Sequence, residues 1–271
     1  MKQRIVLIGG GFVGTYTARL LAKKLPASDI ILLSATDQFL FAPLLIELLA
    51  GDLSERSCSR ELTRWASRRH LQLIQGTATE VDRSHQVIWY QDARSNLKEQ
   101  LHYDLLVFAQ GGTTNFFGTP GAAEHAFSLK TEGDVRRIHD RLQECVTGAQ
   151  QATTEHEKRA LLRFAVVGGG PAGIESICSL QRYAQGIVQQ QASELLPLLS
   201  FQIIEATPDI LPGFPEALRQ AVKTQLDQQH IELCCEDPVT SVTASTVITK
   251  QRTSLVGLVL WTAGVTPASL P

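Results

Sequence analysis

The chain has 271 residues, of which 44% are hydrophobic and 19% charged, and its formal net charge is -2 at pH 7. This composition excludes a disordered or collagen-like chain, and the length is sufficient for two domains. The near-zero charge gives no electrostatic reason to expect a nucleic acid as partner. The densest basic stretch, RWASRRH at residues 64–70, has apolar residues at helical spacing, which favours a solvated helix face over an anion or membrane patch.

The five cysteines indicate a reducing compartment, because their positions 58, 145, 178, 234 and 235 form no C-x-x-C pair. The N-terminus runs straight into an apolar strand interrupted by glycines, which argues against a signal peptide. No apolar run reaches the roughly 18 residues of a membrane span. We therefore expect a cytoplasmic location, and no metal site is predicted.

The first elements of the chain predict a β-α-β unit. Residues 4–8 predict a strand, a glycine turn follows, residues 11–24 predict a helix, and residues 30–33 predict the second strand. A helix is expected near residues 61–69, and short extended pieces over residues 71–112 indicate a strand-rich excursion.

The same pattern returns in the second half of the chain. A proline- and glycine-rich link leads to a predicted helix over residues 131–150, then a strand over 164–167, a second glycine turn, a helix, and a strand over 201–204. The two turns lie 159 residues apart, far beyond the period of a solenoid repeat. The sequence therefore predicts an α/β fold with two duplicated domains.

Both turns have the form strand, G-x-G-x-x-G, helix. The glycines are Gly9, Gly11 and Gly14 in the first turn and Gly168, Gly170 and Gly173 in the second. The first glycine permits the tight turn, the second lets a pyrophosphate approach the backbone, and the third lets the helix pack on the strand. One such match is weak, because glycine-rich strand ends also serve packing. Two in a β-α-β context predict two dinucleotide sites.

The same fingerprint places an acid after the second strand, where it binds the adenosine ribose. Glu205 ends its strand but follows Gly173 by 32 residues, more than the usual ~20. Glu194 fits that spacing better, yet it precedes the strand. Glu205 is therefore preferred, over Glu194 and over a merely exposed strand end, and its carboxylate predicts NADH rather than NADPH. Ser34 occupies the first turn's equivalent position and predicts weaker ribose binding.

Five segments occur in an order that resembles the type II NADH:quinone oxidoreductases: FLFAPLLIELLAG, YDLLVFAQGG, TNFFGTPGAAEHAFSLKT, GGGPAGIE and LVLWTAGV. These single-subunit, non-proton-pumping NADH dehydrogenases are FAD-dependent flavoproteins similar to the pyridine nucleotide-disulphide oxidoreductases, and they include demethylphylloquinone reductase-like members. The resemblance covers essentially the whole chain. It implies two Rossmann-like domains, the second inserted into the first: an FAD-binding part at 1–117, an NADH-binding domain at 118–265, and the start of a return to the FAD domain at 266–271.

The resemblance also implies roles for individual residues. For FAD it implies contacts by Gly9, Gly11 and Gly14 with the pyrophosphate, by Ser34 with the ribose, by Ala78 with the adenine, by Gly111 with the flavin, and by Pro43 and Leu44 near the isoalloxazine. Gly168, Gly170, Gly173 and Glu205 correspond to the NADH site, and Ala263 and Gly264 line the passage back to the flavin domain. Gln110 departs from the family, which usually has threonine there.

Glu175 resembles the family's glutamate near the nicotinamide and quinone, where it is the candidate catalytic residue. Its alternative is an acid in the first turn of a helix, favoured by the macrodipole. The implied activity passes a hydride from NADH to FAD and then electrons to a membrane quinone, with the cofactor supplying the chemistry. The alternatives are a truncated nucleotide-binding module without turnover and a sulfide:quinone reductase.

Cysteine positions weigh against two related enzyme classes. Disulfide reductases need a cysteine pair soon after the first β-α-β unit, and APLLIELLAGD contains none. Sulfide:quinone reductases use separated cysteines beside the flavin, whereas Cys145 and Cys178 fall on helical stretches, where a packing role is favoured for Cys178.

The family pattern continues beyond WTAGV with a Gly-Asp segment at the FAD and an amphipathic membrane-docking region. This sequence ends at Pro271. We therefore expect a truncated chain that holds FAD weakly and lacks the anchor, although the family implies a peripheral position on the cytoplasmic face of a membrane. A homodimer is compatible with the resemblance.

Overall fold

The computed structural model describes residues 2–69 and 71–269. The chain divides into two compact units, each described here by itself. The first comprises Met1–Ala42, Glu55–Thr113 and Thr266–Pro271, and the second comprises Pro43–Ser54 and Thr114–Val265. The chain therefore passes between the two units four times.

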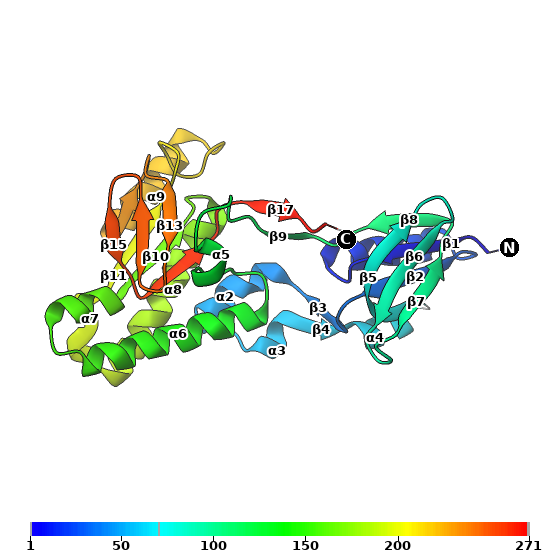
Figure 1. The fold of residues 1–271 in the computed structure, drawn as a ribbon, viewed down its shortest axis with the longest axis horizontal. Helices are drawn as coiled ribbons and strands as arrows, with labels where there is room; N and C mark the ends of the chain where they lie inside the picture. Colours follow the sequence, from blue (N-terminus) through cyan, green and yellow to red (C-terminus); the bar gives the residue numbers. More distant parts are fainter. Residues whose placement is uncertain (1, 70, 270–271) are drawn as a thin grey trace. The chain divides into compact units, whose positions relative to one another are not determined.

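The first unit contains one long helix and a large sheet (Figure 1). Its elements in chain order are β1 (Arg4–Ile8), α1 (Phe12–Lys24), β2 (Asp29–Ser34), β3 (Gln38–Leu40), α3 (Glu55–Cys58), β4 (Ser59–Glu61), α4 (Leu62–Ser67), β5 (Gln72–Asp82), β6 (Val87–Asp92), β7 (Lys98–His102) and β8 (Leu105–Phe108).

The six-stranded sheet of the first unit has the order β7-β6-β5-β2-β1-β8. The strands β5, β2, β1 and β8 run parallel, and β6 and β7 extend them as an antiparallel ribbon. β1 and β2 are buried along almost their whole length, as the continuous apolar runs of central parallel strands require. Their carboxyl ends meet at one edge, where ligands of open α/β sheets bind.

The second unit contains a smaller parallel sheet, several helices and an antiparallel segment. Its elements are α2 (Leu45–Leu49), α5 (Ala122–His125), α6 (Glu132–Gln151), α7 (Glu155–Leu161), β10 (Arg163–Val167), α8 (Pro171–Gln191), η2 (Ser193–Leu198), β11 (Ser200–Ile204), α9 (Glu216–Gln228), β12 (Ile231–Cys234), β13 (Val239–Val242), β14 (Thr246–Thr249), β15 (Thr253–Leu255) and β16 (Leu258–Trp261). The chain passes between units in η1 (Ala42–Leu44), β9 (Gly112–Thr114) and β17 (Val265–Pro267), and after Ser54.

The second sheet repeats the parallel core of the first. Its order is β12-β11-β10-β16, and all four strands are parallel. β10 and β11 correspond to β1 and β2, and β16 occupies the place of β8. Each unit adds antiparallel strands, which in the second unit are β13, β14 and β15. The duplicated α/β fold expected from the sequence is confirmed.

The predicted elements around both glycine turns are confirmed to within one or two residues. The first strand is Arg4–Ile8 as predicted, and the helix expected over residues 131–150 is α6, which begins with a capping box between Thr131 and Asp134. The basic stretch lies on and just after α4, with Arg64 exposed, while His70 lies outside the described residues. Among the residues that the structure describes, no helix is long and apolar enough to cross a membrane.

Residues 43–54 belong to the second unit, where α2 packs against α6 and α8. His139 Nε2 lies 2.9 Å from the carbonyl oxygen of Leu49, and the His139 ring stacks on Tyr183 at 3.7 Å between centroids. Asp52 forms an ion pair with Arg182 of α8. An early segment of the sequence is thus part of a unit formed mainly by the second half of the chain.

Candidate functional site: two glycine turns

The first glycine turn connects β1 to α1 at the carboxyl edge of its sheet. Gly9 has a φ of 115°, a conformation that favours glycine, and its N–H donates to Leu33 O at 2.8 Å. A Cβ added to Gly14 would lie 1.9 Å from Gly9 O, so only glycine allows α1 to approach the strand this closely. These two positions fix the turn by contacts inside the protein.

Gly11 differs from its neighbours, because its space is open. It is the N-cap of α1, and no described heavy atom lies within 4 Å of a Cβ built on it. A side chain here would occupy the space in front of a helix N-terminus, where phosphates bind. The absence of a side chain at Gly11 therefore keeps the backbone accessible to a ligand.

A cavity of about 540 Å³ opens beside this turn, within the size range of ligand pockets. It brings together five residues expected at FAD: Gly9, Gly11, Ser34, Ala78 and Gly111. Gly14 lies behind it, at the packing contact of α1. Ala268, which donates its N–H to Gly111 O at 3.1 Å, also lines the cavity. No sequence signal pointed to Ala268, because its place depends on the chain returning to the first unit.

The second turn repeats the first almost atom for atom. Gly168 has a φ of 112°, and its N–H donates to Ile204 O at 2.9 Å. A Cβ on Gly173 would lie 1.9 Å from Gly168 O, whereas one on Gly170 would meet no described heavy atom within 4 Å. The three glycines therefore divide the same tasks in both units.

The residue after the second strand distinguishes the two turns. Glu205 Oε2 accepts from Gly169 N–H at 2.6 Å, and Oε1 accepts from the Thr207 N–H and hydroxyl, each at 2.8 Å. Ser34 lies against Gly10, the counterpart of Gly169, but its hydroxyl donates to Thr36 O at 2.8 Å. One turn thus has a fixed carboxylate at its edge and the other a buried hydroxyl.

Glu194 lies in η2, before β11 begins. Its predicted position ahead of the strand is confirmed, and Glu205 is the acid that reaches the turn.

The NFFG segment and the WTAG segment pack against each other inside the second unit. Trp261 Nε1 donates to Asn115 O and Ala263 O, both at 2.9 Å. A Cβ on Gly264 would lie 2.5 Å from the Phe117 ring. Thr262 Oγ1 donates to Val167 O at 2.9 Å, directly before the second glycine turn. Thr262 is a further residue at this turn that the sequence reading did not select.

Three further predicted site residues are exposed or half-buried and lie outside the two glycine turns. Glu175 is exposed near the N-terminal end of α8. Pro43 is exposed and Leu44 is half-buried in η1, and both belong to the second unit. Their positions near nicotinamide or flavin stay predictions.

The cysteines behave as packing residues. Within the described structure no disulfide joins any of the five cysteines. Cys145 is buried and its thiol donates to Gly257 O, and burial raises its pKa to about 11. Burial also raises the pKa of Cys178. Since the thiolate is the reactive form, these environments do not favour the redox role that a sulfide:quinone reductase requires.

Comparison with known proteins points in one direction. Residues 3–270 match the profile of a family described as pyridine nucleotide-disulphide oxidoreductase. The external alternative NAD(P)H-ubiquinone oxidoreductase B4, mitochondrial, of Arabidopsis thaliana is 28% identical over 97% of this chain and 47% of its own length. Demethylphylloquinone reductase NdbB of Synechocystis is 30% identical over 99% of this chain and 63% of its own length.

A solved structure of NDH2 from Plasmodium falciparum in complex with NADH has the same fold. It has a TM-score of 0.90 and 25% identity, with 100% of this chain and 56% of that chain covered. The chain thus spans about half the length of most of the curated relatives it matches.

Proposed function

The chain belongs to the pyridine nucleotide-disulphide oxidoreductase family, and from this membership we propose that it is part of an FAD-dependent NADH:quinone oxidoreductase. The first glycine turn binds FAD and the second binds NADH. The observation that carries the proposal is the repetition of one open pyrophosphate cradle, at Gly11 and at Gly170, in two separate units. The resemblance to quinone reductases supports the choice of acceptor.

The residues of the first unit fit an FAD adenosine and pyrophosphate. Gly11 leaves the N-terminus of α1 open to the phosphates, Ser34 offers a hydroxyl to the ribose, and Ala78 lies in the wall of the cavity. When bound, FAD supplies the two-electron chemistry that links hydride donation to quinone reduction. In the balanced reaction NADH becomes NAD⁺, one proton is taken up, and the quinone becomes a quinol.

The residues of the second unit fit NADH. Gly170 leaves the N-terminus of α8 open, and the Glu205 carboxylate, fixed by Gly169 and Thr207, accepts from the ribose hydroxyls. A 2′-phosphate would face that negative charge, so NADH is preferred to NADPH. Glu175 assists proton delivery, and Ala263 and Gly264 line the passage to the flavin. The proposal assigns residues 1–117 and 266–271 to the FAD domain and residues 118–265 to the NADH domain. By their contacts, residues 43–54 and 114–117 belong to the second compact unit.

The partners and location follow from the same proposal. The substrates are NADH and a quinone dissolved in a membrane, so the complete enzyme works as a peripheral protein on the cytoplasmic face. A homodimer is consistent with this arrangement. Liposome flotation tests whether this chain attaches to a membrane.

An absorbance spectrum tests the function directly. The purified chain, supplied with FAD, should be yellow, should bleach without oxygen on addition of NADH, and should recover with a soluble quinone. The Gly11→Ala variant should bind FAD about tenfold or more weakly while retaining NADH binding at the second turn.

Two other results would change the assignment. A colourless protein that still binds NADH would favour a nucleotide-binding module. Bleaching by sulfide rather than NADH would favour the sulfide:quinone reductase.

A further inference from the structure

The loop that follows β11 lies directly on the second glycine turn. Leu211 N–H donates to Gly169 O at 2.8 Å, and the carboxylate of Glu205 accepts from Gly169 N–H. A Cβ on Gly169 would lie 2.8 Å from the Ile210 side chain. Residues 205–211 therefore form the edge of this turn beside the carboxylate expected at the ribose.

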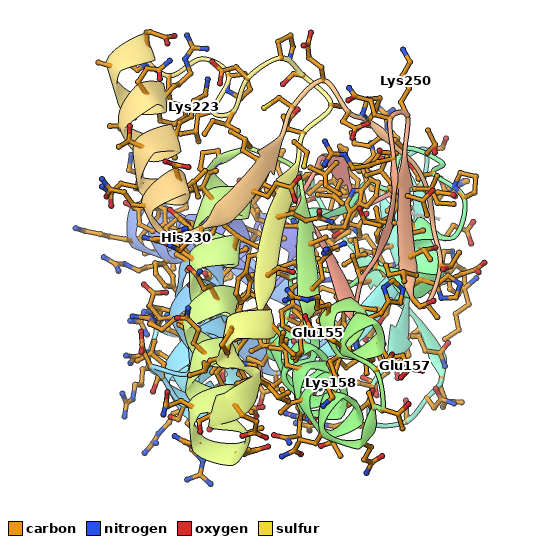
Figure 2. All side chains as sticks on the ribbon, turned by 90° about the vertical axis from the view of Figure 1, so that its left-hand side faces the viewer. Glu155, Glu157, Lys158, Lys223, His230 and Lys250 are labelled. Atoms are coloured by element: carbon orange, nitrogen blue, oxygen red, sulfur yellow. The ribbon has the colours of Figure 1, made fainter. Side chains whose placement is uncertain are left out.

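Asp209 lies within this loop and holds two cations of α9. Its Oδ2 is 2.7 Å from Arg219 Nη1, and its Oδ1 is 2.7 Å from Lys223 Nζ. The exposed fractions of the three side chains are 23% for Asp209, 25% for Arg219 and 31% for Lys223. Partial burial makes these pairs stronger than exposed surface pairs. Lys223 pairs with Asp209, whereas Arg219 also pairs with Glu216 on its own helix. Figure 2 labels Lys223 on α9.

The Cys235 thiol is a further titratable group whose surroundings include charges of this loop and of α9. The Cys235 thiol follows β12, and burial first, then the charges of Asp209 and Glu205, raise its pKa. Lys223 acts on the same thiol in the opposite direction. Thr207 Oγ1 lies 2.8 Å from Glu205 Oε1 and 2.9 Å from the backbone oxygen of Asp209, so both acids belong to the loop that borders the second turn.

We propose that Asp209 determines cofactor specificity at the second turn by holding Arg219 and Lys223 away from a bound nucleotide. A 2′-phosphate requires free cations, whereas Lys223 is paired with Asp209, and Arg219 is paired with Asp209 and Glu216. NADPH is thus rejected twice, by the Glu205 carboxylate and by the pairing of these two cations. This inference rests on the proposal that the second turn binds a nicotinamide dinucleotide.

The decisive variant is Asp209→Asn, which removes the charge but retains an oxygen for the Ile210 N–H. Dissociation constants for NADH and NADPH are measured by calorimetry in four forms: the natural chain, Glu205→Gln, Asp209→Asn and the double variant. We expect Glu205→Gln to reduce the preference for NADH over NADPH. We expect the double variant to bind NADPH with an affinity at least about tenfold higher than that of Glu205→Gln alone. NADH affinity should change little between those two.

Two further substitutions establish the cause. Lys223→Gln in the double variant should remove the gained NADPH affinity, whereas in the natural chain it should leave NADPH affinity unchanged. Asp227→Asn is the matched control, because Asp227 is an exposed acid on the same helix and forms no ion pair among the described residues. It should alter neither affinity.

The outcomes separate the two proposals. If the natural chain binds NADH but the double variant gains no NADPH affinity over Glu205→Gln, only the role of Asp209 is wrong. The same holds if Lys223→Gln weakens NADPH binding in the natural chain, a result that needs no folded Asp209 variant. If the natural chain binds neither nucleotide, both the proposed function and this inference are wrong.

Discussion

The two glycine turns have the same backbone structure, with a different residue at the position expected to contact a ribose. Gly9 and Gly168 differ by 3° in φ. A Cβ added to Gly14 would lie 1.9 Å from Gly9 O, and a Cβ added to Gly173 would lie 1.9 Å from Gly168 O. Beside these matched turns stand Ser34 in one unit and Glu205 in the other. The backbone of the turn is thus the same where the residue beside it differs, so we expect different residues to set pyrophosphate binding and the choice of nucleotide.

The difference extends to the surroundings of each turn. The first turn faces a cavity that Ala268 helps to line, whereas the second is bordered by a loop whose Asp209 holds two cations. The first turn thus lies beside a cavity whose lining residues are uncharged, whereas the second turn lies beside charged side chains that are held in ion pairs. This is the distinction expected between a site that retains a large cofactor and one that selects a substrate that comes and goes.

The largest effect should come from the third glycine of either turn. Gly173→Ala places a methyl group 1.9 Å from a backbone oxygen, and α8 must then move away from its sheet. We expect a loss of unfolding free energy of about 1 to 3 kcal/mol, as for other overpacked sites. Thermal unfolding measures this, and Gly14→Ala should behave alike.

Gly186→Ala is the control for this substitution. Gly186 lies on the same helix, and no described atom is within 4 Å of its Cβ position. Alanine there should be neutral or stabilising by up to about 1 kcal/mol. A Gly173→Ala variant as stable as Gly186→Ala would show that the packing contact is not what fixes this position.

The location of both turns and of Glu205 could be predicted because each depends on neighbours in sequence. The glycine spacing defines a local backbone path, and a strand end is visible as the last apolar residue. The place of residues 43–54 could not be predicted, since it depends on contacts of Leu49 with His139, 90 residues away. The ion pairs of Asp209 could not be predicted from the sequence either, because they form only when the loop packs against α9.

The second effect separates binding from folding. Gly11→Ala and Gly170→Ala add a methyl group where no described atom is near, so the melting temperature should be unchanged. The same methyl groups would meet the ligand, and we expect Gly11→Ala to weaken FAD and Gly170→Ala to weaken NADH, each about tenfold or more. Calorimetry with each ligand tests this. If Gly170→Ala lowered FAD affinity instead, the assignment of the two turns would be reversed.

A smaller effect should appear at alkaline pH, because the units differ in buried thiols. Four of the five cysteines lie in the second unit, and the pKa of Cys145 is raised by burial to about 11. Since the folded pKa exceeds the unfolded value of about 9, the stabilisation is complete below pH 9 and is lost as pH rises toward 11.

Thermal unfolding between pH 8 and about 10 tests this difference. The natural chain should lose several degrees in melting temperature, since about 1 kcal/mol corresponds to roughly 2–4 °C at this size. The Cys145→Ala variant should have a lower melting temperature at pH 8, and its melting temperature should fall less as the pH rises. An equal decline in both proteins would mean that this thiol does not control the alkaline loss.

The smallest effect should distinguish the two ribose residues. Ser34 offers one hydroxyl, whose hydrogen already donates to Thr36 O, so toward a ribose its uncharged oxygen can act only as an acceptor. Ser34→Ala should therefore lower FAD affinity by about 2- to 10-fold, the value of one neutral hydrogen bond. Glu205→Ala removes a charged acceptor and should lower NADH affinity by about tenfold or more. Titrations of each variant with its own ligand compare them, with the melting temperature as a check on folding. A larger loss from Ser34→Ala would mean that the hydroxyl, despite its lack of charge, anchors its nucleotide more firmly than the carboxylate does.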